Sequence, residues 1–276
     1  MNSPRAKKSF GQNFLVDEHV IDRIIQAADA HCGETIIEIG AGRGALTKHL
    51  VEKDCKLVAI EFDRELIESL REEMSALANF VLIESDALTM DFCAAIQPAL
   101  KARVVANLPY NISTAILQRL IEQRRCITEM FLMLQREVVE RIMAPPGSSE
   151  RGYLSVMVEA YCKVEKLFDV EPTAFHPVPK VWSTVARLNM RTDAPLGITN
   201  EILLWRTVSV GFAQRRKTIF NNLRQAPPDV ALRIEAKGGS SHVLEAARIE
   251  PQRRAETLAL EEWLRLARVI ESETIP

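Results

Sequence analysis

The feature that most constrains the fold of this chain is the alternation of short apolar runs with amphipathic stretches between residues 18 and 190. Short apolar runs are typical of buried strands, and the stretches between them repeat apolar residues with the period of a helix. We expect seven strands, at Thr35–Ile39, Leu57–Glu61, Phe80–Glu84, Arg103–Asn107, Glu129–Leu134, Leu154–Tyr161 and Thr184–Asn189. Helices are expected near residues 18–30, 45–53, 64–76 and 113–124. The pattern predicts an α/β fold with a doubly wound, mostly parallel seven-stranded sheet.

The pattern changes after Met190. The segment RTDAPLGITN, residues 191–200, contains a proline and a glycine and predicts a linker, in which Thr199 or Asn200 caps the following helix. Residues 200–276 have helix-like periodicity and no strand-like run. We therefore expect an α/β domain over residues 1–192 and a small all-α domain over residues 193–276.

Composition excludes several classes of protein. No apolar run reaches the roughly 18 residues of a membrane-spanning helix, and the N-terminus MNSPRAKKSFGQNF lacks the apolar stretch of a secretory signal. The five cysteines are scattered and form no C-x-x-C pair, which argues against a disulfide framework or a structural zinc site. A soluble protein of the reducing cytoplasm, without a metal, fits these features best.

Charge is balanced overall but uneven along the chain. The net charge is −2 at pH 7, yet residues 1–8 and residues 205–224 carry basic side chains and no acidic ones. The second cluster consists of Arg206, Arg215, Arg216, Lys217 and Arg224. Such clusters suit a protein that binds a polyanion on one face, although solvated surfaces are the alternative.

The ends of the first three expected strands carry residues suited to a nucleotide-like cofactor. Gly40, Gly42 and Gly44 follow the first strand, where glycines permit a tight turn and close approach of a ligand. Glu61 ends the second strand, where a carboxylate can accept hydrogen bonds from ribose hydroxyls, and a nicotinamide cofactor fits this equally well. Asp86 follows the third strand and can accept from the amine of adenine. The alternative is that these are turn glycines and exposed carboxylates.

The fourth expected strand ends in NLPYNIS, a pattern suited to methylation of an exocyclic amine. Such an amine is a poor nucleophile because its lone pair is delocalised into the ring. The side-chain carbonyl of Asn107 can accept from the amine, and Pro109 restricts Leu108 so that a backbone carbonyl points in a defined direction. Tyr110 can stack on the base. A plain Asn-Pro turn is the alternative.

Together these segments give the chain its resemblance to a known family. KKSFGQNFL, IIEIGAGRGALT, NLPYNIS, FHPVPKVWSTVARL and QRRKTIFNNL resemble the ribosomal RNA adenine dimethyltransferases, most closely the KsgA type, which acts on small-subunit RNA. The resemblance runs from about residue 7 to residue 265. It implies a Rossmann-like class I methyltransferase fold, with S-adenosylmethionine as the methyl donor.

The resemblance also implies roles for individual residues. The cofactor would be bound by Asn13, Leu15, Gly40, Glu61, Asp86 and Asn107. The target base would be surrounded by Leu108, Pro109 and Tyr110, with Phe175 stacked on its other face. Ala41 departs from the family, in which many members have proline between the glycines; this loosens the turn without removing the site.

The family's substrate is a pair of adjacent adenosines near the 3′ end of small-subunit (16S) RNA. We accordingly expect a monomer that acts on the small ribosomal subunit, with Arg215, Arg216 and Lys217 on a helix that contacts RNA phosphates. Three rivals stay open: a large-subunit RNA methyltransferase of the macrolide-resistance type, a non-enzymatic RNA-binding assembly factor and a nicotinamide-dependent oxidoreductase.

Overall fold

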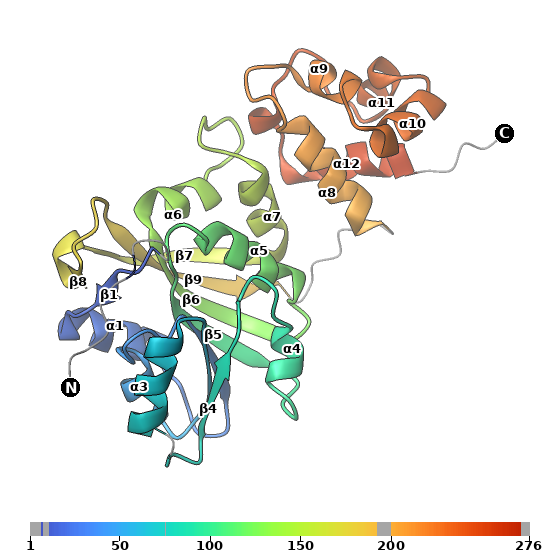
Figure 1. The fold of residues 1–276 in the computed structure, drawn as a ribbon. Helices are drawn as coiled ribbons and strands as arrows, with labels where there is room; N and C mark the ends of the chain where they lie inside the picture. The colour runs from blue at the N-terminus through green and yellow to red at the C-terminus, as the bar shows by residue number, and fades with distance from the viewer. Residues whose placement is uncertain (1–6, 8–10, 75, 192–199, 272–276) are drawn as a thin grey trace. The chain divides into compact units, whose positions relative to one another are not determined.

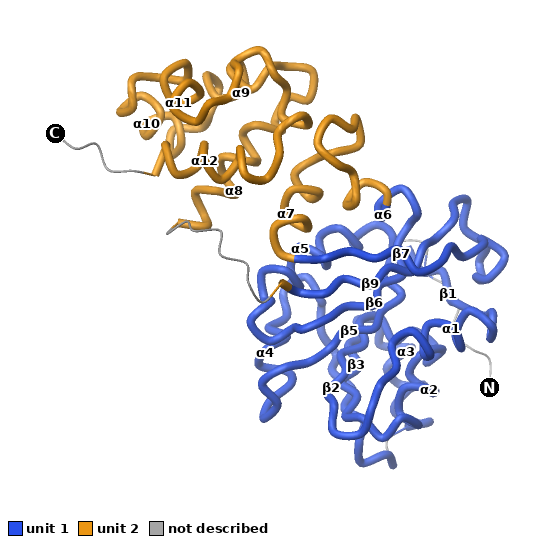
Figure 2. Tube along the Cα trace, turned by 180° about the vertical axis from the view of Figure 1, so that it is seen from behind, with its two compact units in different colours: residues 1–139, 162–190 blue, residues 140–161, 191–276 orange. Residues whose placement is uncertain are grey.

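The computed structural model describes residue 7 and residues 11–74, 76–191 and 200–271. The chain divides into two compact units, coloured separately in Figure 2. The first unit holds residues 1–139 and 162–190, and the second holds residues 140–161 and 191–276. This grouping differs from the expected division at residues 192 and 193 because residues 140–161 join the C-terminal helices. Most of the expected linker lies outside the described residues.

The first unit is built on a seven-stranded sheet, drawn as arrows in Figure 1. In spatial order the strands are β4 (Phe80–Glu84), β3 (Lys56–Glu61), β2 (Thr35–Ile39), β5 (Ala102–Asn107), β6 (Ile127–Gln135), β9 (Ser183–Met190) and β7 (Cys162–Val170). The first five strands pair in parallel, whereas β9 pairs antiparallel with both β6 and β7. The predicted doubly wound, mostly parallel sheet is confirmed.

Helices pack on both faces of this sheet, and Figure 1 shows α1 and α3 on one side of it and α4 on the other. The helices that begin in this unit are α1 (Glu18–Ala28), α2 (Thr47–Val51), α3 (Arg64–Met74), α4 (Phe92–Ala95), α5 (Ser113–Glu122) and α6 (Arg136–Ile142). α1 shows why they form, since Ile21, Ile24, Ile25 and Ala28 recur at helical spacing and are all buried. They join the core with residues of β2, β3, β5 and β6.

One expected strand is a helix. Residues 154–161 lie in α7 (Tyr153–Tyr161), and the strand β7 begins only at Cys162. Hydrophobic periodicity does not separate the two because α7 is apolar nearly all round and buries six of its nine residues. The strand β7 was not predicted, for the opposite reason. It is an edge strand whose sequence CKVEKLFDV exposes charged side chains, so it lacks a clear apolar run.

Among its described residues the second unit contains helices and no strand, which was expected for residues 200–276 but not for residues 154–161. After α7 its elements are α8 (Glu201–Gly211), α9 (Ile219–Arg224), α10 (Pro228–Ala236), α11 (Ser240–Ala246), the short 3₁₀ helix η3 (Ala255–Thr257) and α12 (Leu260–Glu271). The side chain of Asn200 caps α8 by accepting from the Leu203 N–H at 2.9 Å, which confirms one of the two expected caps. Gly211 lies directly against the Trp263 ring, so a larger side chain has no room there.

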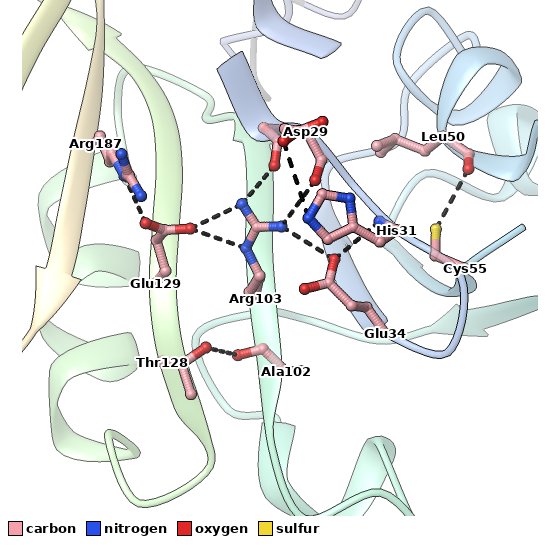
Figure 3. A network of polar contacts seen from close by, with 11 residues as sticks. Asp29, His31, Glu34, Leu50, Cys55, Ala102, Arg103, Thr128, Glu129 and Arg187 are labelled. Carbon is pink, nitrogen blue, oxygen red and sulfur yellow. Dashed lines mark hydrogen bonds and ion pairs between the residues drawn. The ribbon is translucent and has the colours of Figure 1, made fainter. Parts of the chain in front are cut away.

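A polar network ties the sheet together at the end where β2, β5 and β6 begin (Figure 3). Arg103 on β5 forms ion pairs with Glu34 at 3.0 Å and with Glu129 on β6 at 2.8 Å. It also donates to the carbonyl of Ala28 at the end of α1, and Glu129 accepts in turn from Arg187 on β9 at 2.5 Å. The network thus joins elements far apart in sequence.

The structure corrects one inference from the cysteines. Cys93 on α4 and Cys126 just before β6 form a disulfide that closes a loop of 33 residues. Cys32 is exposed, and Cys55 and Cys162 are buried free thiols. The two paired cysteines are distant in sequence, so their spacing carried no signal; the fold brings the end of α5 against α4.

Candidate functional site

A cavity of about 250 Å³ opens where β2, β3, β4 and β5 end. It is lined by five groups of residues, all in the first unit: residues 11–14, the glycine turn after β2, residues 60–63 after β3, residues 85–88 after β4, and residues 107–112 after β5. In open α/β sheets, ligands bind at this edge because the loops after parallel strands converge there. The predicted residues Asn13, Gly40, Glu61, Asp86 and Asn107 all line this one cavity.

The glycine turn has a backbone shape that requires glycine. Gly40 and Gly42 have φ angles of +73° and +59°, in the left-handed region that other residues rarely adopt. A side chain at Gly40 would begin 3.7 Å from the Asn107 carbonyl and 3.8 Å from the Pro109 ring, which narrows the space for a ligand. Ala41 between them is buried, and its carbonyl accepts from the Gly44 N–H at 2.9 Å. The turn is therefore well formed without proline.

Glu61 organises the cavity wall through backbone hydrogen bonds. Its carboxylate accepts from the N–H groups of Gly42, Phe62 and Asp63 at 2.8–2.9 Å, and only 8% of the residue is exposed. An ionised carboxylate has about four acceptor sites, so it retains capacity for a ligand hydroxyl. Asp86 is fixed in a similar way, because one of its oxygens accepts from the Leu88 N–H at 2.9 Å. Both carboxylates are held in place before any ligand arrives.

Asn107 is oriented by the N-terminal segment. Its side-chain amide nitrogen donates to the backbone carbonyl of Asn13 at 3.4 Å, which fixes the identity of the two amide ends because a carbonyl only accepts. The side-chain oxygen of Asn107 therefore remains an acceptor at the half-buried end of β5. The Asn107 side chain thus offers the acceptor oxygen that an amine with two N–H groups needs.

The rest of the NLPY motif is anchored on both sides. Leu108 is buried, and its N–H donates to the Met133 carbonyl of β6 at 3.3 Å. The Tyr110 hydroxyl lies 2.7 Å from the hydroxyl of Ser183 at the start of β9. Burial raises the pKa of the Tyr110 phenol, and the hydrogen bond with Ser183 opposes only part of this rise. The ring is thus held as a neutral, pre-positioned surface.

Two groups near the cavity were not foreseen from the sequence. Asp63 is 3% exposed, and it accepts from Lys7 at 2.7 Å and from Gln12 at 3.0 Å. Burial acts to raise the pKa of Asp63, but the hydrogen bonds from Lys7 and Gln12 outweigh it and leave the pKa below its usual value. These bonds fasten Lys7 and Gln12 to the loop after β3, at the wall of the cavity. The only indication of this role in the sequence was the presence of an acidic residue, Asp63, directly after Phe62.

The second such group is Glu38 on β2, just before the glycine turn. It is 2% exposed and lines a small cavity of about 30 Å³ together with Leu15, Gly40 and Asn107. Burial raises the pKa of Glu38 from 4.5 to about 8, and the nearby charge of Glu61 adds to the rise. Leu15, a predicted cofactor contact, lines this smaller cavity and is not among the residues that line the larger one.

Phe175 does not lie where the resemblance implied. Strand β8 (Phe175–His176) pairs antiparallel with β1 (Phe14–Leu15), and this pairing sets Phe175 opposite Leu15. Both side chains enter the apolar core beneath α1, and Phe175 is 1% exposed. Its ring has no free face on which a base can stack in this arrangement. The pairing of β1 with β8 gives Phe175 a packing role, and supports the N-terminal segment from below.

The basic cluster of the second unit also differs from expectation. Arg215, Arg216 and Lys217 lie in the turn between α8 and α9, not on a helix, and all three are exposed. None of them forms an ion pair with a described residue, although Arg215 donates to the Ser149 carbonyl. Arg206 is instead paired with Asp229 at 2.6 Å. A turn lets three consecutive cations face solvent, which a regular helix does not.

Among the residues that the structure describes, no helix has the length and apolar character needed to cross a membrane. No group of three or more histidine, cysteine, aspartate or glutamate side chains is gathered there as metal ligands are.

Comparison with known proteins identifies the family. The family model described as ribosomal RNA adenine dimethylase matches residues 3–266. The chain is 42% identical over 263 residues to ribosomal RNA small subunit methyltransferase A of Hahella chejuensis, covering 95% of this chain and 92% of the relative. It is 43% identical to the protein of the same name from Pseudomonas aeruginosa, covering 95% and 94%.

Solved structures agree with the sequence comparison. A dimethyladenosine transferase from Plasmodium falciparum matches with a TM-score of 0.76 and 26% identity, over 92% of this chain and 95% of that one. The 23S rRNA methyltransferase ErmE matches with a TM-score of 0.65 and 26% identity, over 94% and 100%. The family model, the curated relatives and the matching fold show that this chain belongs to the ribosomal RNA adenine dimethylase family of methyltransferases.

Proposed function

We propose that the protein transfers methyl groups from S-adenosylmethionine to the exocyclic amines of two adjacent adenosines near the 3′ end of 16S RNA, on the small ribosomal subunit in the cytoplasm. The observation that carries the proposal is the orientation of Asn107. Its amide nitrogen donates to the Asn13 carbonyl, which leaves its oxygen as an acceptor for the target amine. The two curated bacterial relatives with 42–43% identity are named for the small subunit.

The cavity residues fit the cofactor. Its cationic sulfonium makes the methyl group electrophilic, so the chain itself needs no strong base. Glu61 accepts from the ribose hydroxyls, Asp86 accepts from the adenine amine, and Gly40 admits the methionine part beside Asn107. Electrostatic positioning of this kind acts by holding acceptors where positive charge develops.

The same residues prepare the target amine. The Asn107 oxygen and a backbone carbonyl of the NLPY segment accept its two N–H groups, so the nitrogen becomes tetrahedral and its lone pair is freed. Tyr110, held by Ser183, stacks on the base. The amine would then attack the methyl group, the carbon–sulfur bond of the sulfonium would break to leave S-adenosylhomocysteine, and the amine would release a proton to solvent.

Incubation with labelled S-adenosylmethionine tests the proposal. Immature small subunits and large subunits are offered separately, and the RNA is digested to nucleosides. We expect label only in dimethyladenosine from the small subunit. Label in large-subunit RNA would support the macrolide-resistance type, whose structural relative is only 26% identical to this chain. No label in either subunit would favour a non-enzymatic assembly factor.

Binding of the cofactor is tested independently by calorimetry. Glu61→Ala and Asp86→Ala should each weaken S-adenosylmethionine binding by about 1–3 kcal/mol, since a ligand polar group loses its partner. Glu84→Ala is the matched control, because Glu84 ends the neighbouring strand but is outside the cavity lining. Unchanged affinity in both variants, with the fold intact, would remove these two assignments.

A further inference from the structure

The loop before β9 exposes a tryptophan close to the base site. Trp182 is 39% exposed, whereas Trp263 is fully buried and Trp205 packs against two tyrosines. Tryptophan is largely buried on average because its surface contributes strongly to hydrophobic stability. A large aromatic ring left accessible next to Ser183, the residue that anchors Tyr110, therefore indicates a ligand contact.

A cation is fixed beside this ring. The Arg136 N–H donates to the Trp182 carbonyl at 3.0 Å, which extends the pairing of Gln135 with Ser183 by one residue. The Arg136 guanidinium carbon lies 5.7 Å from the centre of the Trp182 ring, within range of a cation–π interaction. The backbone hydrogen bond between Arg136 and Trp182 thus fixes the guanidinium and the indole next to each other.

This pair is adjacent to the anchor of Tyr110. Ser183, whose hydroxyl holds the Tyr110 hydroxyl at 2.7 Å, is the next residue after Trp182. Successive residues of an extended chain point to opposite faces. The Trp182 ring and the Tyr110 ring therefore contact different groups of a ligand. One nucleotide is held at Tyr110, and the surface at Trp182 remains available for its neighbour.

The chemistry of the pair matches a nucleotide. Indole faces stack on nucleobases of any sequence, and guanidinium groups bind phosphate. Lys180 in the same loop is exposed and adds a second cation. Asp169, a carboxylate that senses the charge of Arg136, accepts hydrogen bonds from Lys166 and Thr184. The surface therefore offers an aromatic platform with positive charge.

We infer that Trp182 and Arg136 bind a nucleotide that flanks the target adenosine, with its base on the indole and its phosphate at the guanidinium. The inference rests on the proposed RNA methylation. It adds a second binding position, outside the NLPY motif, that holds the RNA strand in register while the target base enters the cavity.

Steady-state methylation of immature small subunits tests the inference. Trp182→Ala should raise the KM for subunits by about tenfold, the loss typical of one base stack, with kcat and cofactor affinity unchanged. Trp182→Phe should restore most of the loss, because an aromatic face remains. Leu100→Ala is the control, since it removes an apolar side chain that is 78% exposed elsewhere in the same unit. An unchanged KM in Trp182→Ala, with wild-type protein active, overturns the inference alone; inactive wild-type protein overturns the proposed function instead.

Crosslinking identifies the ligand. A photoreactive benzoylphenylalanine at position 182 is irradiated with bound small subunits, and the crosslinked partner is sequenced. Crosslinks to RNA within a few nucleotides of the methylated adenosines support the inference. Crosslinks to a ribosomal protein, crosslinks to distant RNA, or the absence of any crosslink overturn it.

Discussion

At the residue scale, the site depends on side chains that are held before a ligand binds. Asn107, Glu61 and Tyr110 each have a specific partner on another element, namely Asn13, the Gly42 N–H and Ser183. Such preorganisation matters because groups that are already oriented need no rearrangement when charge develops. The reactive geometry is therefore a property of contacts between segments, not of the NLPY sequence alone.

Asn107→Ala should abolish methyl transfer while preserving the fold and most of the RNA binding. We expect the single-turnover rate to fall at least 100-fold, roughly the loss when one positioned polar group at a reacting centre is removed. Asn189→Ala, on β9 at the opposite end of the sheet, should keep the normal rate. Rapid-quench measurement with saturating subunits decides this, and a near-normal rate in Asn107→Ala would contradict the mechanism.

The buried Glu38 predicts an unusual pH dependence of stability. Its pKa is raised from 4.5 to about 8 in the folded protein, so the folded state holds a proton that the unfolded state has lost between these values. The free energy of unfolding therefore falls as pH rises from about 5 to 8, by at most about 1.4 kcal/mol per pH unit from this group.

Glu38→Gln should remove this contribution. The free energy of unfolding of Glu38→Gln, relative to that of wild type, should rise steadily from pH 5.5 to pH 8. The difference between the two proteins should level off above pH 8. Urea denaturation at several pH values measures the difference. A constant offset between the two proteins across this range would show that Glu38 does not retain its proton.

At the scale of elements, short local segments owe their positions to links between distant parts of the chain. The Arg103 network joins α1, β2, β5, β6 and β9, and the Cys93–Cys126 disulfide joins α4 to the turn before β6. α4 follows the Asp86 loop, so the disulfide also limits the movement of that part of the cofactor wall.

Reduction of the disulfide should lower stability measurably. A loop of 33 residues corresponds to about 3–4 kcal/mol if the crosslink acts by restricting the unfolded chain. Cys93→Ser should unfold at lower urea concentration than wild type under oxidising conditions, and the two should converge in a reductant. Cys32→Ser, which alters an exposed free thiol, should match wild type throughout. Equal midpoints for oxidised wild type and Cys93→Ser would show that the bond adds nothing.

At the scale of the whole molecule, the candidate site and the exposed basic turn belong to different compact units. The cavity lies in the first unit, and the basic turn of Arg215, Arg216 and Lys217 lies in the second. We propose that the basic turn contacts phosphates, which adds affinity that is independent of sequence and sensitive to salt, and that the cavity selects the base. The net charge of −2 does not reveal that basic side chains are concentrated in one part of the second unit.

Changing Arg215, Arg216 and Lys217 to Glu should weaken subunit binding and flatten its dependence on salt. Each phosphate contact contributes about −0.7 to the slope of log K against log salt for single strands. Cofactor affinity and melting temperature should stay at wild-type values, because none of the three forms an ion pair with a described residue. A lower melting temperature with a normal salt slope would instead assign these residues a structural role.

The sequence by itself determined the sheet, the helical C-terminal part and the residues at the strand ends. These follow from local periodicity and from the rule that loops after parallel strands converge, so Gly40, Glu61, Asp86 and Asn107 were predictable. The apolar segment 154–161 was not, because a short run buried on all sides satisfies a strand and a helix equally.

Only the tertiary structure decided which distant residues meet. Pairing of β1 with β8 buries Phe175 against Leu15, the fold brings Cys93 to Cys126, and Asn13 reaches Asn107 across 94 positions of the chain. Local preference cannot specify such contacts, since they arise when several elements bury their apolar faces together. The same packing leaves only 2% of Glu38 exposed and sets Trp182 beside the anchor of Tyr110.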